Sequence, residues 1–254
     1  MVSRLPQYDY IYLGDNARSP YGNRSFDTVL HYTQQCVQAL FDKGCNLVIL
    51  ACNTASAKAL RNIQQNYLPK EAPDKKVLGV IRPTTEIVGN YTKTGHVGIL
   101  GTTGTIASQS YPIEILKFFP EVKVFQQACP MWVSLVENNE YTNEGSDYFV
   151  KKYLNELLVQ SPEIDSIVLG CTHYPLLIKK IEAFLPKGIT ILSQSEIVAN
   201  SLHDYLSRHP EIEHLCQKNS NQIFYTSDDT QTFDTMAGIF FGKNVESKHI
   251  EINV

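Results

Sequence analysis

Two cysteines, Cys52 and Cys171, each stand where an apolar run gives way to polar residues. The segments around them read LVILACNTAS (residues 47–56) and IVLGCTHYPL (residues 167–176). Each pattern predicts a buried strand followed by a cysteine at the start of a helix. Ligands of open parallel sheets bind beyond the carboxyl ends of the strands, and the partial positive charge of a helix N-terminus favours a thiolate. We therefore expect two ionisable thiols with lowered pKa values in one site.

The residues that follow the two cysteines are suited to a small acidic substrate. Asn53 and Thr54 add an amide and a hydroxyl beside the first thiol, and backbone N–H groups at a helix start bind carboxylates. Thr172 and His173 add a hydroxyl and an imidazole beside the second thiol. Thiols on opposite sides of a carbon that bears a carboxylate suit stereochemical inversion, because one thiolate removes a proton while the other thiol delivers one. His173 is placed to help ionise its neighbouring thiol.

Other interpretations of these cysteines stay open at this point. Both could be small residues that fill tight strand-to-helix turns. A hydrolase with a Cys–His pair would need one thiol and would leave the second without a role. A zinc site could recruit Cys52, Cys171 and His173, but Cys-x-His is an unusual ligand spacing and no fourth ligand is evident. Cys36, Cys45 and Cys216 are expected to be structural, whereas the role of Cys129, which precedes Pro130, stays open, with a buried position favoured.

A turn rich in glycine and threonine, residues 101–105, follows another predicted strand. It could hold a carboxylate or phosphate through Thr102 and Thr105, or it could serve only as a helix N-cap. The turn lacks the lysine of a P-loop and the spacing of a dinucleotide fingerprint. Nucleotide binding is therefore not supported.

Composition excludes several classes of protein. The chain has 254 residues and a net charge of −4, and without a cluster of Lys or Arg it is not expected to bind nucleic acid. No apolar run reaches the about 18 residues of a membrane span. Residues 1–6 lack the apolar core of a signal peptide. Six cysteines without a C-x-x-C pair suit a reducing compartment, so we expect a cytoplasmic protein.

Short apolar runs alternate with longer helical patterns, which predicts an α/β fold with mainly parallel sheets. Strands are expected at residues 8–13, 47–50, 76–81, 96–100, 123–126, 166–169, 190–192 and 223–226. Helices are expected at residues 25–43, 54–67, 105–119, 148–158, 175–184, 195–208 and 234–241, with a helix or turn at Pro83.

The two cysteine segments are similar to one another, and their cysteines are 119 positions apart (171 − 52), close to half the chain. Two lobes of related design would each present one thiol. We expect a first lobe of residues 1–82 plus 193–254 and a second lobe of residues 83–192. The active site would lie in the cleft between these pseudo-symmetric lobes.

Five motifs run in order along nearly the whole chain: GDNARSPYG (residues 14–22), ACNTASA (51–57), GTTGT (101–105), ACPMWVSLVE (128–137) and GCTHYPLL (170–177). Together they resemble the glutamate racemases of the cofactor-independent aspartate/glutamate racemase superfamily. The resemblance implies two α/β lobes, interconversion of L- and D-glutamate for peptidoglycan synthesis, and commonly a homodimer. It implies chemistry without pyridoxal phosphate, another cofactor or a metal, and neither a nucleic acid nor a membrane as partner.

The resemblance also assigns roles to individual residues. It implies that Cys52 and Cys171 are the two catalytic acid/bases, each working on one face of Cα. It implies that Tyr21 and Gly22 close on the substrate carboxylate and that Glu137 lies near the second thiol. The residues implied to contact the substrate beside the thiols are Asn53, Thr54, Thr172 and His173.

The sequence departs from the family pattern in three places. Family members begin with a strand that ends in Asp-Ser-Gly-x-Gly-Gly, and the printed sequence begins after it. Since exposing the neighbouring strands would cost about 25 cal/mol per Å² of apolar area, such a chain is expected to fold poorly or to be nearly inactive. Arg82 replaces a commonly acidic residue before proline, and Ser193-Gln194 lacks an Asp often found after that strand. Two alternatives follow: racemisation of aspartate or a hydantoin, and an inactive fragment that only binds.

Overall fold

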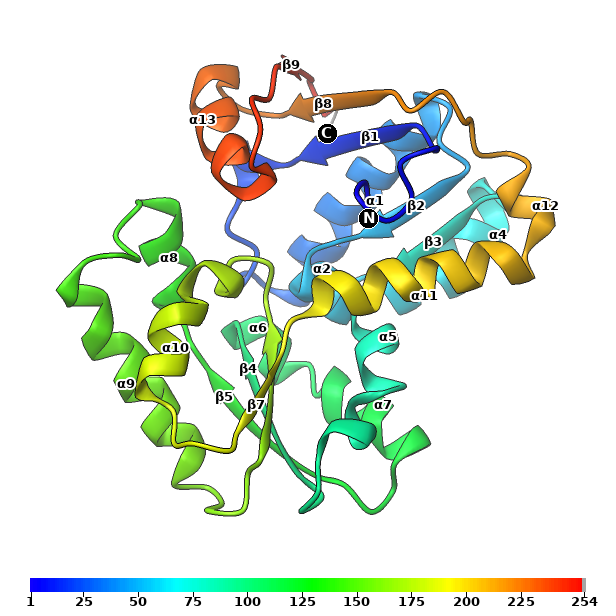
Figure 1. The fold of residues 1–254 in the computed structure, drawn as a ribbon. Helices are drawn as coiled ribbons and strands as arrows, with labels where there is room; N and C mark the ends of the chain where they lie inside the picture. The colour runs from blue at the N-terminus through cyan, green and yellow to red at the C-terminus, as the bar shows by residue number, and fades with distance from the viewer. Residues whose placement is uncertain (253–254) are drawn as a thin grey trace.

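The computed structural model describes residues 1–252, and all strand pairings within them are parallel (Figure 1). The strands are β1 (Tyr10–Gly14), β2 (Leu47–Leu50), β3 (Lys76–Gly79), β4 (His96–Gly101), β5 (Lys123–Ala128), β6 (Ser166–Gly170), β7 (Thr190–Leu192), β8 (Gln222–Thr226) and β9 (Ser247–His249). Helices alternate with them for most of the chain. The predicted α/β class with mainly parallel sheets is confirmed.

The α-helices vary widely in length. They are α1 (Phe26–Asp42), α2 (Asn53–Lys58), α3 (Leu60–Asn62), α4 (Leu68–Glu71), α5 (Ile81–Thr85), α6 (Thr103–Ala107), α7 (Ser110–Phe118), α8 (Trp132–Glu137), α9 (Glu144–Leu158), α10 (Ile178–Phe184), α11 (Gln194–Arg208), α12 (Pro210–Glu213) and α13 (Thr230–Phe241). Shorter turns are η1 (Asn16–Arg18), the π-helical η2 (Ile63–Tyr67), η3 (Val88–Tyr91) and η4 (Tyr174–Leu177).

The largest sheet has the order β5-β4-β6-β7 and forms the lower half of the molecule in Figure 1. Every residue of β4 and β6 is buried, which explains their continuous apolar runs. Alternate strand residues point to opposite faces. Trp132, Leu157 and Ile181 from α8, α9 and α10 cover one face, and Tyr111 and Ile115 from α7 cover the other. This rigid sheet carries Cys171 directly after β6.

Two smaller sheets form the upper half: β1-β8-β9 and β2-β3. Helix α1 packs against β2 and β3 through Val37 and Phe41. Helix α11 leaves the lower sheet after β7 and packs its buried Leu202 and Leu206 against Leu5. Strand β2 carries Cys52 two residues beyond its end.

Strands β4 to β7 share one sheet, and the chain enters that region through α5 and leaves it through α11. The lobe boundaries at residues 82 and 193, and the pseudo-symmetry between lobes, stay predictions. Residues 253 and 254 of the expected first lobe lie outside the described residues.

Several helices differ from expectation. The single helix predicted at residues 54–67 is a series of short segments, interrupted where Ala59 has a φ of −112° and widened at η2. The helix predicted at residues 105–119 breaks into α6 and α7 at Gln109, whose φ of 56° is left-handed. Helix α11 begins at Gln194 with Ser193 as N-cap, so the predicted start at Ser195 is wrong. The sequence patterns did not predict α8, α12 or β9.

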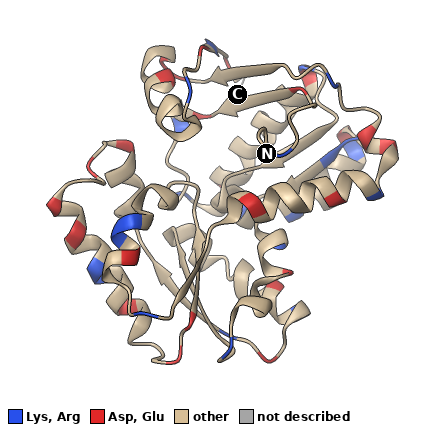
Figure 2. Cartoon of the chain, in the orientation of Figure 1, with Lys and Arg blue, Asp and Glu red and all other residues tan. Residues whose placement is uncertain are grey.

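None of the helices within residues 1–252 is both long and apolar enough to cross a membrane. Figure 2 shows charged residues of both signs on α9, α10 and α11, whereas the strands of the lower sheet are largely without charge.

Candidate active site

The first candidate thiol, Cys52, is the N-cap residue of α2. Burial raises the pKa of this thiol above its ordinary value, although hydrogen bonds from the N–H groups of Ala55 and Thr54 and from the Thr54 hydroxyl lower it. The residue as a whole is nevertheless exposed to solvent. Solvent, and therefore a small substrate, can reach the residue that carries the first thiol.

The second candidate thiol, Cys171, directly follows β6 and is 8% exposed. Burial raises its pKa to about 12, opposed by hydrogen bonds from the backbone N–H of His173 and from Thr172. The negative charges of Cys52 and Glu137 raise the Cys171 pKa further. The two sulfurs therefore lie within electrostatic reach of one another.

The expectation of lowered thiol pKa values is wrong for both cysteines. Helix α2 has 6 residues and the turn η4 after Cys171 has 4, so neither carries the aligned dipoles of a long helix. Loss of hydration then outweighs the backbone donors. Each group therefore ionises at a higher pH than an ordinary cysteine.

The imidazole of His173 links the second thiol to a carboxylate. Its Nδ1 lies 3.8 Å from Cys171 Sγ and 3.4 Å from Thr172 Oγ1, and its Nε2 lies 3.2 Å from Glu137 Oε1. Phe240 of α13 meets the imidazole edge to face, with ring centroids 5.6 Å apart. The residues predicted around the second thiol are thus in contact with each other.

Three threonine hydroxyls meet beside the first thiol. Thr54 Oγ1 lies 2.8 Å from Thr102 Oγ1 and 3.2 Å from Thr105 Oγ1, and the last two are 3.0 Å apart. The Thr102 hydroxyl also accepts the N–H of Thr105, which makes it the N-cap of α6. Both interpretations of this turn therefore stay open, because capping and ligand binding are compatible.

The loop that carries Tyr21 and Gly22 lies against the same turn. The Gly22 carbonyl accepts the N–H of Gly104 at 2.7 Å. The Tyr21 hydroxyl donates to Asp15, which also pairs with Arg18. This loop is therefore held to the start of α6 at Gly22, and the Tyr21 hydroxyl bonds within its own loop.

The side chain of Asn53 is engaged within the protein. Its Oδ1 accepts the Tyr111 hydroxyl at 2.8 Å, and its Nδ2 donates to Gln194 Oε1 at 2.8 Å. Sequence reasoning missed Tyr111 and Gln194 as site residues. The sequence offered one indication of Gln194, because Ser193-Gln194 lacks the Asp that family members often have after that strand.

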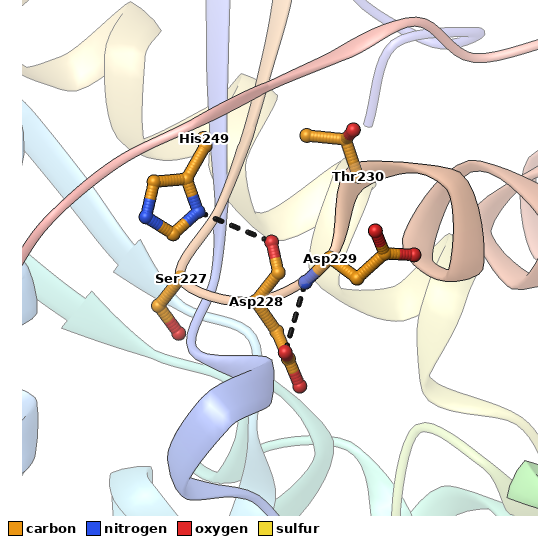
Figure 3. Close-up of a pocket in the computed structure, with 5 residues that line it drawn as sticks. All are labelled: Ser227, Asp228, Asp229, Thr230 and His249. Atoms are coloured by element: carbon orange, nitrogen blue, oxygen red, sulfur yellow. Dashed lines mark hydrogen bonds between the residues drawn. The ribbon is translucent and has the colours of Figure 1, made fainter.

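Two pockets lie near these elements. One of about 360 Å³ at the start of α13 is lined by Ser227, Asp228, Asp229, Thr230 and His249, and the His249 imidazole donates to the Asp228 carbonyl (Figure 3). A second of about 20 Å³ is lined by Pro20, Gly22, Asn23, Thr102, Cys129, Pro130, Val133 and Ser134. Neither is lined by the two candidate thiols, so a cleft that holds both stays a prediction.

Within residues 1–252, no group of three or more His, Cys, Asp or Glu side chains is arranged to hold a metal ion. The six cysteines are all free thiols. The zinc interpretation therefore has no ligand set among the described residues.

Comparison with known proteins gives consistent results. The sequence profile described as Asp/Glu/Hydantoin racemase matches residues 2–202. The chain is 36% identical to a glutamate racemase of Roseobacter denitrificans, covering 96% of this chain and 91% of the relative. It is 35% identical to that of Aquifex aeolicus, covering 96% and 88%.

Solved structures show the same similarity. A glutamate racemase isoform from Bacillus anthracis superimposes with a TM-score of 0.88 at 32% identity, covering 98% of this chain and 90% of that chain. A glutamate racemase from Francisella tularensis in complex with D-glutamate gives 0.86 at 27% identity, covering 99% and 91%.

Proposed function

This chain belongs to the Asp/Glu/hydantoin racemase family, and we propose that it interconverts L- and D-glutamate by proton transfer at two thiols, without pyridoxal phosphate. One observation carries the mechanism: Cys52 and Cys171 each follow a parallel strand, and the charge of one raises the pKa of the other. The relatives named glutamate racemase support glutamate as the substrate. The D-glutamate formed by this reaction would be used in peptidoglycan synthesis.

The proposed reaction moves one proton at each face of Cα. One sulfur, as thiolate, takes the Cα proton, and the electron pair left on carbon is delocalised toward the substrate carboxylate. The S–H of the other cysteine then donates its proton to the opposite face, so the two cysteines exchange protonation states in each turnover. The N–H groups of Ala55, Thr54 and His173 supply hydrogen bonds that stabilise each thiolate.

The raised thiol pKa values set a requirement on the substrate. A thiolate is scarce at neutral pH when burial raises its pKa. The positive ammonium group of a bound amino acid would favour the thiolate, since an opposite charge within about 4–6 Å stabilises the charged form. Substrate binding and thiol ionisation are therefore coupled in this proposal.

The polar groups around the thiols have distinct proposed roles. His173, held by Glu137, orients and exchanges a proton with Cys171. Thr54, Thr102 and Thr105, with Gly22 of the adjacent loop, receive the substrate carboxylate. Thr172, Tyr21 and Asn53 are further proposed substrate contacts. Tyr21 requires a side-chain adjustment, because its hydroxyl bonds to Asp15. Asn53 is proposed to contact the substrate through its backbone N–H at the start of α2, because its side-chain amide bonds to Tyr111 and Gln194.

The test is isotope incorporation during inversion. The chain is incubated in deuterated water with L-glutamate, D-glutamate or either aspartate enantiomer, and circular dichroism and mass spectrometry follow each. We expect both glutamates to approach the racemate, with deuterium at Cα appearing first in the product enantiomer. Absence of inversion would overturn the proposed racemisation in favour of a protein that only binds its ligand, and faster turnover of aspartate would overturn the choice of substrate. A Listeria relative named glutamate racemase, assayed in parallel, serves as the positive control for both measurements.

One solved relative, the glutamate racemase from Francisella tularensis, is in complex with D-glutamate, and none of the described helices is long and apolar enough to span a membrane. We further propose a homodimer that works in the cytoplasm. Free cysteines suit a reducing compartment. Helix α7 exposes Ile113 and Leu116, which are 46% and 61% accessible, as a candidate contact for a second copy. Sedimentation of the chain and of Leu116→Glu measures the dimer.

A further inference from the structure

A closed ring of hydrogen bonds joins three helices behind the two thiols. Asn53 is the first residue of α2, Tyr111 lies on α7 and Gln194 is the first residue of α11. Gln194 Nε2 lies 2.9 Å from the Tyr111 hydroxyl, which lies 2.8 Å from Asn53 Oδ1, and Asn53 Nδ2 lies 2.8 Å from Gln194 Oε1. We call these three side chains the amide–phenol ring.

The direction of each hydrogen bond in the ring is fixed. The Val80 carbonyl can only accept, and it lies 3.0 Å from Gln194 Nε2, so that nitrogen is the donor end of the amide. Gln194 Oε1 then accepts from Asn53 Nδ2, and Asn53 Oδ1 accepts the Tyr111 hydrogen. The Tyr111 oxygen in turn accepts from Gln194. All donors run in one sense, so each bond polarises the next.

The amide–phenol ring lies next to the backbone of both candidate cysteines. Asn53 directly follows Cys52. On the other side, a Cβ added to Gly170, the residue before Cys171, would lie 3.2 Å from Tyr111 Cε2 and 3.3 Å from its hydroxyl oxygen. Burial raises the pKa of Tyr111, and the negative charge of an ionised Cys171 raises it further. One tyrosine therefore contacts the chain beside each sulfur.

Two of the three side chains in the ring are almost completely shielded from water that could replace a broken bond, and the third, Gln194, is partly buried. Tyr111 is 0% exposed and Asn53 is 2% exposed. Thr84, also 0% exposed, lies 2.9 Å from Gln194 Nε2 and shares one of the two amide hydrogens with another acceptor. A buried polar group without its partner is costly, so loss of one member displaces the others rather than leaving them in place.

We propose that the amide–phenol ring is a positioning device that fixes the separation of the two thiols, with Tyr111 and Gln194 as positioning residues for the reaction. The proposal rests on the proposed racemisation. The ring holds α2 and the end of β6 at one spacing, so that both sulfurs address one Cα. Displacement of reacting atoms by about 1 Å can cost about 100-fold in rate.

The test compares ring variants with matched variants elsewhere. Tyr111→Phe removes the ring hydroxyl and Gln194→Met removes the amide. Tyr153→Phe is the control for a buried tyrosine, at 4% exposure, and Gln64→Met is the control for a glutamine that donates to one backbone carbonyl, that of Val77 at 2.8 Å. For each variant, kcat and KM are measured for both glutamates, and mass spectrometry maps alkylation of Cys52 by iodoacetamide against pH.

Both ring variants are expected to lower kcat about 10- to 100-fold with little change in KM. Cys52 alkylation should shift to higher pH in them, because the N–H groups of Thr54 and Ala55 lose their fixed direction. Both controls should match the parent. For every protein kcat/KM must change by one common factor for the two enantiomers, because their equilibrium constant is unity.

Full kcat in either folded ring variant would overturn the proposal, and thermal melts show which variants are folded. A parent chain that does not racemise glutamate would instead defeat the proposed function. In that case the alkylation profile still decides the ring, since it needs no turnover: an unchanged Cys52 profile in both ring variants overturns it, and a shifted profile supports it.

Discussion

The Nε2 atom of His173 lies 3.2 Å from Glu137 Oε1, and a second His–Glu pair with the same spacing occurs far from the candidate thiols. That second pair joins His96, at the start of β4, to Glu163, also with 3.2 Å between Nε2 and Oε2. Because β4 is parallel to β6, its start lies at the opposite end of the sheet from Cys171. Replacing Glu by Gln in each pair therefore distinguishes a catalytic effect of the lost carboxylate from a purely structural one.

Glu137→Gln is expected to lower kcat by about 100-fold, because the neutral amide no longer orients His173 as a proton carrier for Cys171. Glu163→Gln is the matched control and should leave kcat unchanged. Steady-state racemisation of both glutamates measures each variant, with thermal melts as a check on folding. Equal rates in the Glu137→Gln variant and its parent would contradict a role for this carboxylate.

Cys52→Ser and Cys171→Ser are each expected to lower racemisation by at least about 100-fold, because each face of Cα needs its own proton carrier. Each variant keeps one thiol, so it should still exchange the Cα hydrogen of one enantiomer for deuterium without inverting it. The two variants should differ in which enantiomer exchanges. Cys216→Ser, at a half-buried cysteine outside the site, is the control. Racemisation by either single variant at the parent rate would contradict the two-thiol mechanism.

Sequence patterns predicted the elements that depend on local composition. The strands Leu47–Leu50 and Thr190–Leu192 have the predicted bounds, since apolar runs between turn residues leave little choice of end points. Strand β9 (Ser247–His249) was missed because its residues are polar and short, and it is a strand through its pairing with β8. The break at Gln109 was missed because its left-handed backbone occurs without a glycine.

The candidate site likewise contains features that local sequence predicts and features that depend on distant segments. Cys52 and Cys171 were predictable because position after a strand is a local property. The raised thiol pKa values were not, since burial comes from packing of distant segments. The bond between Asn53 and Gln194 joins residues 141 positions apart, and no local pattern encodes it.

Activity is expected to rise with pH above neutrality. Burial raises the pKa of Cys171 to about 12, so its thiolate is scarce at pH 7 and increases about tenfold per pH unit. The kcat/KM for glutamate should therefore rise from about pH 7 to about pH 8.5, which is the pKa of an ordinary free cysteine. Alkylation of Cys171, mapped by mass spectrometry, should keep rising beyond the pH at which a cysteine in a short peptide reaches its plateau. A plateau for Cys171 below pH 8 would show that its pKa is not raised.

Gly22→Ala tests the contact between the loop of residues 14–22 and the threonine turn. An added Cβ would lie 2.9 Å from Thr102 Cβ, closer than side chains tolerate, and Gly22 also accepts the N–H of Gly104. The loop must then shift away from the hydroxyls proposed to receive the carboxylate. We expect KM for glutamate to rise about tenfold and the free energy of unfolding to fall by about 1–3 kcal/mol.

Gly145→Ala is the matched control, because a Cβ there meets nothing within 4 Å. That substitution lies within α9 and should raise stability by about 0.5–1 kcal/mol without changing KM. Glutamate titration of the rate and urea unfolding measure both variants. If Gly22→Ala lowers stability but leaves KM unchanged, the loop supports the fold and does not take part in carboxylate binding. A raised KM in both variants would instead trace the effect to glycine replacement in general, because Gly145 lies on a helix that the proposed site does not use.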